Sequence, residues 1–557
     1  MTTAQAPRVL VLGGAGAFGR RLVEGLVATT SATVIVAGRR LDACEALAAE
    51  LRARHSGRSI EAARLDRAVA TAAEITSLDP VIVADAAGPF QGAHLRFACA
   101  VISAGRHYVD IADARDFVAA FPALDAEARA AGVVAVTGAS STPAVSHAAL
   151  DVLTDGWTRV DRVEIAISPG NRAPRGLSVI AAILSYTGAS VRVLRDGGWS
   201  AAPGWGLLAS RLMPGLGRRF LSLCETPDLD LVPARFPTVR TALFRAGLEL
   251  PILHLGLWSL SLPRRAGLVR DLARFAGPAQ RLASLFERFG SDRGGMTVEA
   301  EGLGAEGACA RARWSLVAEA GDGPNVPILP ALSFMRGLLE GRPPAGPGAH
   351  VAAGLLSLPA FEAEAARFAI RTAISESSPS APLLFGRALG PDLARLPEIV
   401  RAVHDPNPSV RLVGCAETTS AETAAGRLVA RLFGFPETVP QIEAEIEIRK
   451  TGDGEIWTRR FGRSCFRSRL SASGEPGVLV ERFGPFAFDL AIAANPDGFT
   501  LAVEGWRVFG LSAPRRLAPT TEARGFALAD GAYGFDVTIA LAPFGRLVRY
   551  RGRLEPA

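Results

Sequence analysis

The segment from 9 to 22 constrains the fold of this chain more than any other part of the sequence. It contains the pattern Gly14-x-Gly16-x-x-Gly19, which follows four apolar residues at 9–12 and precedes apolar residues at helical spacing. The pattern predicts a strand, a tight turn and a helix. In that setting the first glycine permits the turn, the second lets the backbone approach a pyrophosphate, and the third lets the helix pack on the strand. We expect a dinucleotide at this helix N-terminus, and a purely structural glycine-rich turn is the alternative.

The end of the next predicted strand, 32–37, indicates which dinucleotide binds. A site for NAD places an acid about 20 residues after the glycines, where it binds the ribose 2′-hydroxyl. Here Arg39 and Arg40 follow the strand, and the first acid is Asp42. A carboxylate would repel a 2′-phosphate, whereas a guanidinium binds it. The sequence therefore predicts NADP, and a solvated arginine pair at a helix start is the alternative.

Further cofactor contacts are predicted where other strands end, because turns at the carboxyl ends of parallel strands line the cofactor site. Residues 79–86 read as a strand that runs into the turn Ala87-Gly88-Pro89-Phe90. Asp66 follows the third strand, where it either flanks the adenine or is a plain surface residue. The residues predicted to bind the cofactor are Gly14, Gly16, Ala17, Phe18, Gly19, Arg39, Arg40, Asp66, Ala87, Gly88, Pro89 and Phe90.

The composition excludes several classes of protein. With 49% apolar and 21% charged residues over 557 positions, the chain is globular and long enough for two to four domains. The six cysteines show no C-x-x-C spacing, so we expect neither a disulfide framework nor a metal site. Most of the positive charge is arginine, without a basic cluster interleaved with aromatic residues, so we expect no nucleic-acid partner. Lys450 is the only lysine, which excludes a Schiff-base lysine and a Tyr-x-x-x-Lys pair before it.

The predicted fold class is α/β, with three domains. Residues 1–145 read as a Rossmann-like, doubly wound parallel sheet, and residues 146–374 as an α+β domain for substrate binding and dimerisation. Within that second domain we expect helices over most of 177–193 and over 361–374. Residues 375–382 are small, polar and rich in proline, which is typical of a linker. Residues 383–557 read as a β-rich antiparallel sheet or barrel. The chain enters a strand almost at once, so we expect no signal peptide and a cytoplasmic protein.

The apolar segment 246–263 has three interpretations. A membrane-spanning helix needs about 20 apolar residues with few charges, and this segment contains Glu249, His254 and two prolines. A buried element or substrate wall is the second interpretation. The third is an interfacial segment, flanked by Arg264 and Arg265, that contacts a membrane surface.

Several motifs resemble known families. The glycine motif, Ala37-Gly38-Arg39, Ala87-Gly88-Pro89-Phe90 and His107-Tyr108-Val109-Asp110-Ile111 resemble the saccharopine dehydrogenase-like family. That resemblance implies an NAD(P)-dependent oxidoreductase whose second domain shapes the substrate site and often dimerises. The C-terminal part resembles the domain of unknown function DUF4166, at His404-Asp405, Gly434-Phe435-Pro436, Glu455-x-Trp457-x-Arg459-x-Phe461, Glu481-Arg482-x-Gly484 and Tyr550-x-Gly552-x-Leu554. The second resemblance implies no chemistry.

Hydride transfer also needs a proton donor, and few side chains qualify. We predict Tyr108 and Asp110 as catalytic residues, because they end a strand that we expect to face the crevice; a core tyrosine and a turn aspartate are the alternatives. Weaker candidates are Tyr186, Ser140, Ser141, Thr142, His107 and His147. Glu455, Trp457 and Arg459 alternate on one strand face and read as structural.

The lead hypothesis is an NADP-dependent reductase of an apolar, lipid-like enoyl or carbonyl substrate, because the middle domain is strongly apolar. An imine reductase of an amino acid or polyamine would need arginines aimed at substrate carboxylates, and candidates exist at Arg172, Arg175, Arg192 and Arg195. A cofactor-binding protein without catalysis is the third hypothesis. We also expect the chain to form a homodimer and to contact a membrane surface peripherally.

Overall fold

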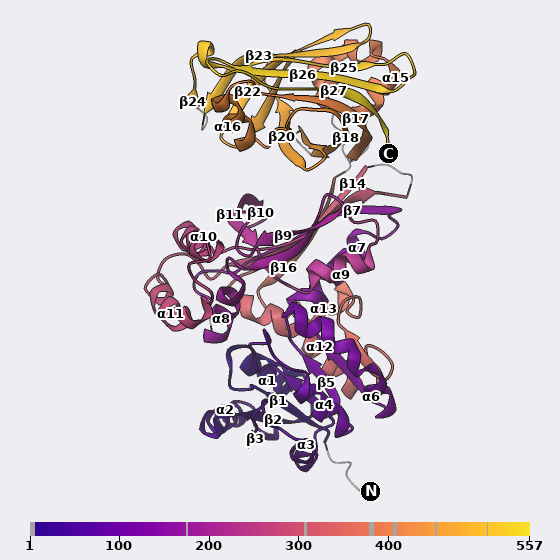
Figure 1. Cartoon of the computed structure of the whole chain (residues 1–557). Helices are drawn as coiled ribbons and strands as arrows, with labels where there is room; N and C mark the ends of the chain where they lie inside the picture. The colour runs from indigo at the N-terminus through magenta and orange to yellow at the C-terminus, as the bar shows by residue number, and fades with distance from the viewer. Residues whose placement is uncertain are drawn as a thin grey trace. The chain divides into compact units, whose positions relative to one another are not determined.

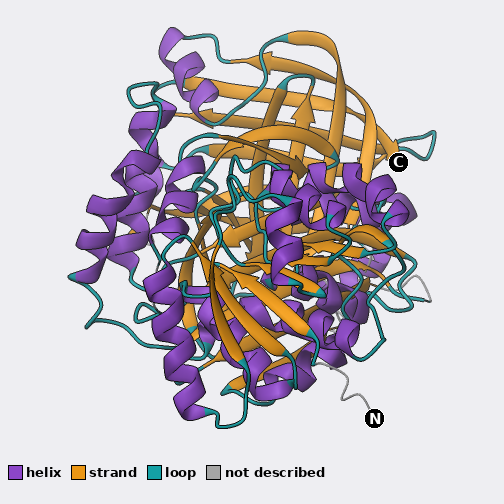
Figure 2. Ribbon diagram, turned by 90° about the horizontal axis from the view of Figure 1, so that it is seen from below, coloured by secondary structure: helices purple, strands orange, loops and turns teal. Residues whose placement is uncertain are grey.

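The computed structural model describes residues 6–173, 176–305, 309–377, 384–404, 409–451, 454–508 and 511–557 (Figure 1). It contains two compact units. The first comprises Met1–Gly302 and Arg311–Glu376, and the second comprises Leu303–Ala310 and Ser377–Ala557. Of the predicted linker, residues 375–377 end a strand, and residues 378–382 lie outside the described residues. Figure 2 distinguishes the helices and strands of both units.

The first unit begins with the predicted doubly wound sheet. Seven parallel strands take the order β15-β6-β5-β4-β1-β2-β3. Its strands are β1 (Arg8–Leu12), β2 (Thr33–Gly38), β3 (Ile60–Arg64), β4 (Ile82–Asp85), β5 (His107–Asp110), β6 (Val134–Thr137) and β15 (Gly348–Val351). Its connecting helices are α1 (Ala17–Thr29), α2 (Leu41–Arg54), α3 (Ala72–Leu78), α4 (Arg96–Ser103), α5 (Arg115–Ala120), η1 (Phe121–Leu124) and α6 (Asp125–Ala130). The strand order reverses between β1 and β4, and such a switch point is where open α/β sheets bind ligands.

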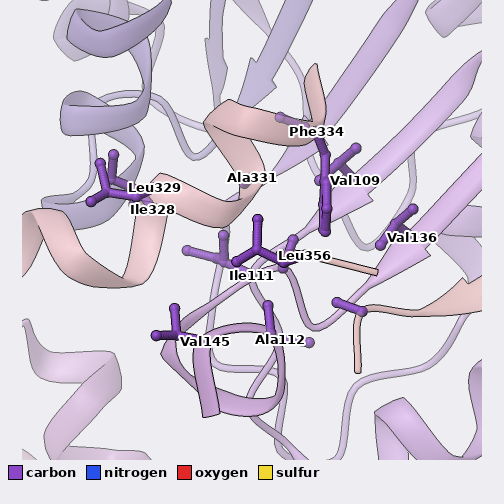
Figure 3. Close-up of a cluster of buried hydrophobic side chains, with 14 of the residues drawn as sticks. Val109, Ile111, Ala112, Val136, Val145, Ile328, Leu329, Ala331, Phe334 and Leu356 are labelled. Atoms are coloured by element: carbon purple, nitrogen blue, oxygen red, sulfur yellow. The ribbon is translucent and has the colours of Figure 1, made fainter. Parts of the chain in front are cut away.

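Apolar burial on both faces explains why these strands read as continuous hydrophobic runs. The helix α12 (Leu329–Leu339) packs on β5 and β6, where Phe334 lies near Val109 and Val136 (Figure 3). On the same helix Leu332 approaches Gly25 of α1 so closely that a Cβ there would lie 3.0 Å from Leu332 Cδ2. Each large side chain buried in this way contributes about 1.5–3 kcal/mol.

The seventh strand comes from far along the chain. β15 pairs in parallel with β6, from Gly348 opposite Val134 to Val351 opposite Thr137. The amide of Ala349 also donates to Asp125 Oδ1 at 3.0 Å. The chain therefore builds most of a second sheet, returns to complete the first one with β15, and then adds the last strand of the second sheet.

That second sheet is mixed, as the α+β prediction requires. Its central order is β10-β11-β12-β7-β13-β14-β16, and β8 pairs with both β12 and β9. The strands are β7 (Arg159–Ser168), β8 (Ser190–Arg195), β9 (Gly198–Pro203), β10 (Ala209–Met213), β11 (Gly217–Leu223), β12 (Thr241–Ala246), β13 (Gly294–Leu303), β14 (Cys309–Ala318) and β16 (Ile370–Ser377). The helices of this part of the chain are η2 (Ser141–Val145), α7 (Ser146–Leu153), α8 (Leu177–Tyr186), α9 (Asp228–Arg235), α10 (Pro251–Arg265), η3 (Ala273–Phe275), α11 (Ala276–Ser284), η4 (Gly323–Ile328) and α13 (Leu358–Ala365).

Two predicted helices of this region are wrong in part. The helix over 177–193 ends at Tyr186, because Gly188 takes a positive φ of 75° and the next residues form β8. The helix over 361–374 is α13 followed by β16. Val191 and Val193 are buried at alternate positions of their strand. β-Branched residues at alternate positions favour strand pairing over a helix.

The apolar segment 246–263 leaves the end of β12 and becomes α10. Its polar residues hold neighbouring loops. Glu249 accepts hydrogen bonds from the amides of Asn171 and Ser291, at 2.7 and 2.8 Å, while the buried His254 lies 3.0 Å from the Ser222 hydroxyl. Among the parts of the chain that the structure describes, no helix is both long and apolar enough to cross a membrane.

The second unit confirms the β-rich antiparallel prediction. Its strands follow the order β22-β21-β20-β19-β18-β17-β27-β26-β25-β23-β24, and β22 also pairs with β23, which closes a barrel. The strands are β17 (Ser409–Ser420), β18 (Val439–Thr451), β19 (Gly454–Phe461), β20 (Ser464–Ala472), β21 (Val478–Phe483), β22 (Phe486–Asn495), β23 (Gly498–Val508), β24 (Leu511–Ser512), β25 (Thr520–Ala527), β26 (Tyr533–Leu541) and β27 (Gly545–Pro556). Its helices are α14 (Leu384–Leu389), η5 (Gly390–Arg395), α15 (Glu398–Val403), α16 (Ala424–Leu432) and η6 (Arg515–Leu517).

Candidate cofactor and substrate site

The turn after β1 depends on Gly13. This residue has a φ of +76°, and a Cβ on it would lie 2.9 Å from the backbone of Ala86 and Ala87. The left-handed conformation therefore falls on Gly13 rather than on Gly14, to which the sequence pattern assigned the turn. Gly14 is required for packing, because its Cβ would lie 2.8 Å from Val36 Cγ1. The two glycines together bring the ends of β1, β2 and β4 close to one another.

The next two glycines shape the start of α1. A Cβ on Gly19 would lie 2.1 Å from the carbonyl oxygen of Gly13, so only glycine lets the helix pack against the loop. Gly16 is the exposed N-cap, and no side chain caps the helix there. Ala17 is exposed, Phe18 is half-buried, and the first turn contains no acidic residue. The exposed, side-chain-free N-terminus fits the pyrophosphate of a dinucleotide.

The arginines that follow β2 are available to a ligand. Arg39 and Arg40 are both exposed, and neither side chain has a hydrogen bond or an ion pair among the described residues. Asp66 lies after β3, where its Oδ1 accepts the amide of Ala68 at 3.0 Å and so shapes a turn. Its predicted contact with the adenine stays a prediction.

A buried ion pair holds the predicted turn after β4. Asp85 is 1% exposed; its Oδ1 accepts the amide of Ala87 at 2.9 Å, and its Oδ2 lies 2.7 Å from Arg67 Nε. The Arg67 guanidinium stacks over the ring of Phe90, 4.4 Å from its centroid. Gly88 and Pro89, which lie between Ala87 and Phe90 in this turn, are exposed. Burial raises the pKa of Asp85, although Arg67 and the Ala87 amide oppose that shift.

Tyr108 does not face the crevice, contrary to the sequence-based expectation. It is fully buried, stacked on Phe121 with ring centroids 5.7 Å apart, and its hydroxyl lies 3.4 Å from Asp85 Oδ2. Burial, together with the charges of Asp110 and Asp85, raises the pKa of Tyr108 well above its usual value. The structure thus places this tyrosine in the core, and its catalytic role stays a prediction without geometric support.

Asp110 joins the ends of β5 and β6. Its Oδ1 accepts the amide of Ala112 at 3.0 Å, the hydroxyl of Thr137 at 2.9 Å and the amide of Gly138 at 2.8 Å. Its Oδ2 has no hydrogen-bond partner among the residues described. Burial raises the pKa of Asp110 to about 7. These contacts are structural, and a catalytic role for Asp110 stays a prediction.

A carboxylate that sequence reasoning missed lies beyond β5. Asp113 is exposed, accepts Gln91 Nε2 at 3.2 Å, and has a raised pKa because the surrounding protein desolvates it. Burial raises the pKa values of Tyr186 and Cys224, whose hydroxyl and sulfur atoms lie 2.9 Å apart, and the charge of Asp113 adds to both shifts. Asp113 therefore lies near residues of the second sheet. No local pattern marks it, because its neighbours come from distant segments.

The weaker sequence candidates lie in the protein interior, and polar contacts hold the two histidines among them. His147 lies 2.9 Å from Arg235 Nη1, and burial lowers its pKa to about 3, so it is neutral near pH 7. His107 accepts the amide of Val134 at 2.9 Å, and burial lowers its pKa. Ser140, Ser141 and Thr142 are buried beside η2.

The arginines of the second sheet are also engaged. Arg192 forms an ion pair with Asp230 at 2.7 Å and stacks over Trp199, 4.2 Å from its ring centroid. Arg115, from the first sheet, binds the same aspartate at 2.5 Å. Arg172 donates to the carbonyl of Arg288 at 3.4 Å, and Arg195 ends β8. Arg175 lies outside the described residues.

Family comparisons agree with these observations. Residues 9–136 match the model of the saccharopine dehydrogenase NADP binding domain, and residues 396–554 match the domain of unknown function DUF4166. No protein of curated function matches the sequence.

Several solved structures match parts of this chain at low identity. Apo saccharopine dehydrogenase (L-Glu forming) from Saccharomyces cerevisiae is 15% identical, with 67% of this chain and 100% of that chain covered and a TM-score of 0.48. GenD2 from gentamicin A biosynthesis, solved in complex with NAD, is 17% identical over 58% of this chain and 75% of its own, with a TM-score of 0.27. A dehydrogenase from Chromobacterium violaceum is 12% identical over 57% and 76%, with a TM-score of 0.28.

The family matches and the glycine-loop geometry lead to one assignment. Residues 9–136 form a nicotinamide-dinucleotide-binding domain of the saccharopine dehydrogenase type, and the chain is an NAD(P)-dependent oxidoreductase that carries a DUF4166 domain at residues 396–554.

Proposed function

We propose that this protein is an NADPH-dependent reductase of an apolar, lipid-like enoyl or carbonyl substrate. The observation that carries the cofactor half of this proposal is that Arg39 and Arg40, which follow β2, are exposed and have no hydrogen-bond or ion-pair partner among the residues that the structure describes. A free guanidinium at this position binds a 2′-phosphate through charge-assisted hydrogen bonds. The glycine loop would hold the pyrophosphate, and a nicotinamide cofactor supplies the hydride when bound.

The cofactor proposal is tested by the Arg39→Ala variant. Charge-assisted hydrogen bonds contribute about 1.5–3 kcal/mol, so its Kd for NADPH should rise roughly 10- to 150-fold while its Kd for NADH stays unchanged. Arg58→Ala is the matched control, because Arg58 is also exposed but precedes β3. It therefore lies at the amino ends of the strands, whereas Arg39 lies at their carboxyl ends. An Arg39→Ala variant with unaltered preference for NADPH would contradict the proposal.

The apolar surface of the second sheet's helices supports the substrate half. α8, α10 and α11 pack together through Ile180, Leu257 and Ala276. They nevertheless leave large apolar side chains exposed, including Ile252 at 65% and Leu285 at 67%. Exposed apolar side chains clustered on neighbouring helices mark binding sites more often than chance exposure does.

This surface also supports peripheral membrane contact. Exposed arginines lie among the apolar residues, and positive charge beside apolar side chains suits an anionic lipid surface. We define the α10–α11 surface as Ile252, Leu268, Leu282, Leu285, Phe289, Arg265, Arg270, Arg274, Arg281 and Arg288. A protein bound there could take up a lipid-like substrate from the membrane.

Vesicle flotation tests the membrane contact. The chain should float with vesicles that contain phosphatidylserine and less with phosphatidylcholine alone. Leu285→Asp, which places a carboxylate in the apolar part of the surface, should abolish flotation, whereas Val413→Asp, at an exposed position of β17 in the second unit, should not. The proposal would be refuted if both variants floated as well as the unaltered chain. A homodimer that Leu285→Asp dissociates in sedimentation velocity experiments would assign the surface to self-association instead.

Asp113 is the proton donor that we propose. It is an exposed carboxyl three residues after β5, at the carboxyl end of the parallel sheet, and a protonated carboxyl there can donate to a bound substrate. Asp113→Asn should lower kcat roughly 100-fold or more without changing the Kd for NADPH. NADPH oxidation would be followed with long-chain enoyl thioesters and aldehydes, and with amino-acid imines as the competing substrates. Turnover of the imines alone would overturn the lipid-like substrate.

A further inference from the structure

The barrel of the second unit contains a cavity that the oxidoreductase assignment does not explain. Its volume is about 490 Å³, within the range of roughly 300–1,000 Å³ that is usual for small-molecule sites. Most of its lining is aliphatic or aromatic, with contributions from β20, β22, β23 and β26 such as Leu470, Leu490, Phe499 and Val537. Well-packed protein interiors leave few voids of this size. A barrel that keeps its interior open and apolar is therefore built to hold an apolar ligand.

One part of the cavity wall is polar, and its charges compensate one another. Arg459 of β19 lies over the ring of Trp457, 4.9 Å from the centroid. Its guanidinium donates to the hydroxyl of Ser468 at 2.8 Å and to Glu481 at 3.3 Å. Because Glu481 neutralises Arg459, the interior offers no uncompensated charge for an ionic ligand group. The third charged lining residue, Arg524, is exposed.

Two phenols give the same wall free hydrogen-bonding capacity. Tyr533 and Tyr550 are both buried and line the cavity. Among the described residues, neither hydroxyl has a hydrogen-bond partner. The charge of Arg459 acts on the pKa of both, which places them near it, and burial raises the pKa of Tyr550 to about 12. Both phenols are therefore protonated near neutral pH and can donate to an uncharged oxygen.

The cavity has an apolar rim. Leu432 at the end of α16 is 80% exposed, and Leu517 at the end of η6 is 51% exposed; both line the cavity. Single exposed leucines are ordinary, but two that line the same cavity form an apolar path from its interior to the surface.

From the volume of the cavity, its apolar lining and the two phenols that have no hydrogen-bond partner among the described residues, we propose that the DUF4166 barrel binds one molecule with a single long hydrocarbon chain and an uncharged oxygen-containing head, such as a fatty alcohol, aldehyde or ester. The chain occupies the apolar lining, and the head accepts hydrogen bonds from Tyr533 and Tyr550. The proposal does not depend on the reductase function, since every residue that carries it lies in the second unit.

The test uses the full chain and the uncharged fluorescent probe N-phenyl-1-naphthylamine, with the cofactor absent. We expect one tight site per chain, from which oleyl alcohol and methyl oleate displace the probe at least tenfold better than sodium oleate does. Displacement by sodium oleate at equal or lower concentration would overturn the uncharged head. A chain that binds no probe and neither neutral lipid would overturn the site itself.

Variants locate the site inside the barrel. Ala523→Trp and Thr521→Trp each add a large side chain to inward-facing positions of β25. Each should raise the Kd of the probe at least tenfold. Ala493→Trp is the matched control, because Ala493 is exposed on β22 and does not line the cavity, so it should bind as the unaltered chain does. Circular dichroism identifies the filled variants that fold. Unchanged probe affinity in a folded filled variant would refute the barrel as the binding site.

The phenols are tested separately. A variant with Tyr533→Phe and Tyr550→Phe keeps the apolar lining and removes both donors. Two ordinary hydrogen bonds at about 0.5–1.5 kcal/mol each predict that oleyl alcohol binds roughly 5- to 150-fold more weakly, while the probe binds as before. Equal weakening for the probe and the alcohol would contradict the assignment of the head group to these tyrosines.

Discussion

The ion pair between Arg67 and Asp85 offers the most direct test of how the cofactor domain is held together. Arg67→Met removes the guanidinium and keeps an unbranched side chain beside Phe90. Asp85 then retains the amide of Ala87 at 2.9 Å, while the hydroxyl of Tyr108 at 3.4 Å is beyond the usual range for an O–H···O hydrogen bond. The variant leaves a buried carboxylate with one good donor.

The cost of that variant can be worked out in two ways. Breaking a buried ion pair on one side costs about 3–5 kcal/mol. Alternatively, Asp85 takes up a proton in the folded state. Its unfolded pKa is about 3.9, so protonation at pH 7 costs at most about 4 kcal/mol, at 1.36 kcal/mol for each pH unit. Both routes agree. Because the second cost arises from a raised folded pKa, the deficit should be largest at and above pH 7 and should shrink as pH falls towards 4.

Hydrogen exchange measured by mass spectrometry on peptides that cover β4 and β5 would report this change. A local readout is needed, since the chain has two units and a single unfolding free energy is not defined for it. Arg67→Met combined with Asp85→Asn should recover most of the lost protection, because no buried charge remains. A deficit that is equal at pH 5 and pH 8, or a double variant as weakly protected as Arg67→Met, would refute the reasoning.

Three further predictions concern single side chains. Burial opposes ionisation of Glu455, but His404 and Lys450 outweigh that effect and lower the pKa of Glu455 to about 2. The barrel should therefore lose roughly 3 kcal/mol of stability as pH falls from 5 to 2. Hydrogen exchange in β18 and β19 should show a smaller loss of protection for Glu455→Gln than for the unaltered chain. Because burial raises the pKa of Asp110 to about 7, the protection of β5 and β6 against hydrogen exchange should fall as pH rises from 4 to 7. Asp110→Asn should make that protection less dependent on pH. An Asp110→Asn variant whose protection changes with pH as steeply as that of the unaltered chain would contradict the prediction. Gly19→Ala should lower the stability of the cofactor domain by roughly 1–3 kcal/mol or more and weaken NADPH binding, because the added Cβ would overlap a carbonyl oxygen. Gly256→Ala is the control, because its Cβ would meet open space in α10. Calorimetric titration with NADPH should give the same result for Gly256→Ala as for the unaltered chain.

Local signals account for the parts of the fold that could be predicted. The glycine pattern, the apolar runs and their spacing predict the cofactor sheet and the β-rich domain, because each depends on residues close together in sequence. Tyr108 shows where such signals end. Strands of a parallel sheet are buried on both faces, so periodicity does not reveal which face of β5 a side chain takes.

Contacts between distant segments explain most of what could not be predicted. Arg67 meets Asp85 across two strand ends, and Asp113, in the loop after β5, lies near Tyr186 at the end of α8. Neither pair has a spacing that a sequence pattern records. β15 could not be predicted either, since its four residues join β6 only after all strands of the second sheet except β16 have passed along the chain.

The late return of β15 has a consequence for synthesis on the ribosome. A nascent chain that has emerged only as far as β6 has an unpaired sheet edge and lacks α12, which covers the apolar face of β5 and β6. Exposed edges and uncovered apolar faces are where incomplete chains associate wrongly. The cofactor domain should therefore mature only after the second sheet as far as β14, and then α12 and β15, have left the exit tunnel. Cofactor binding would thus wait until most of the second sheet has been synthesised.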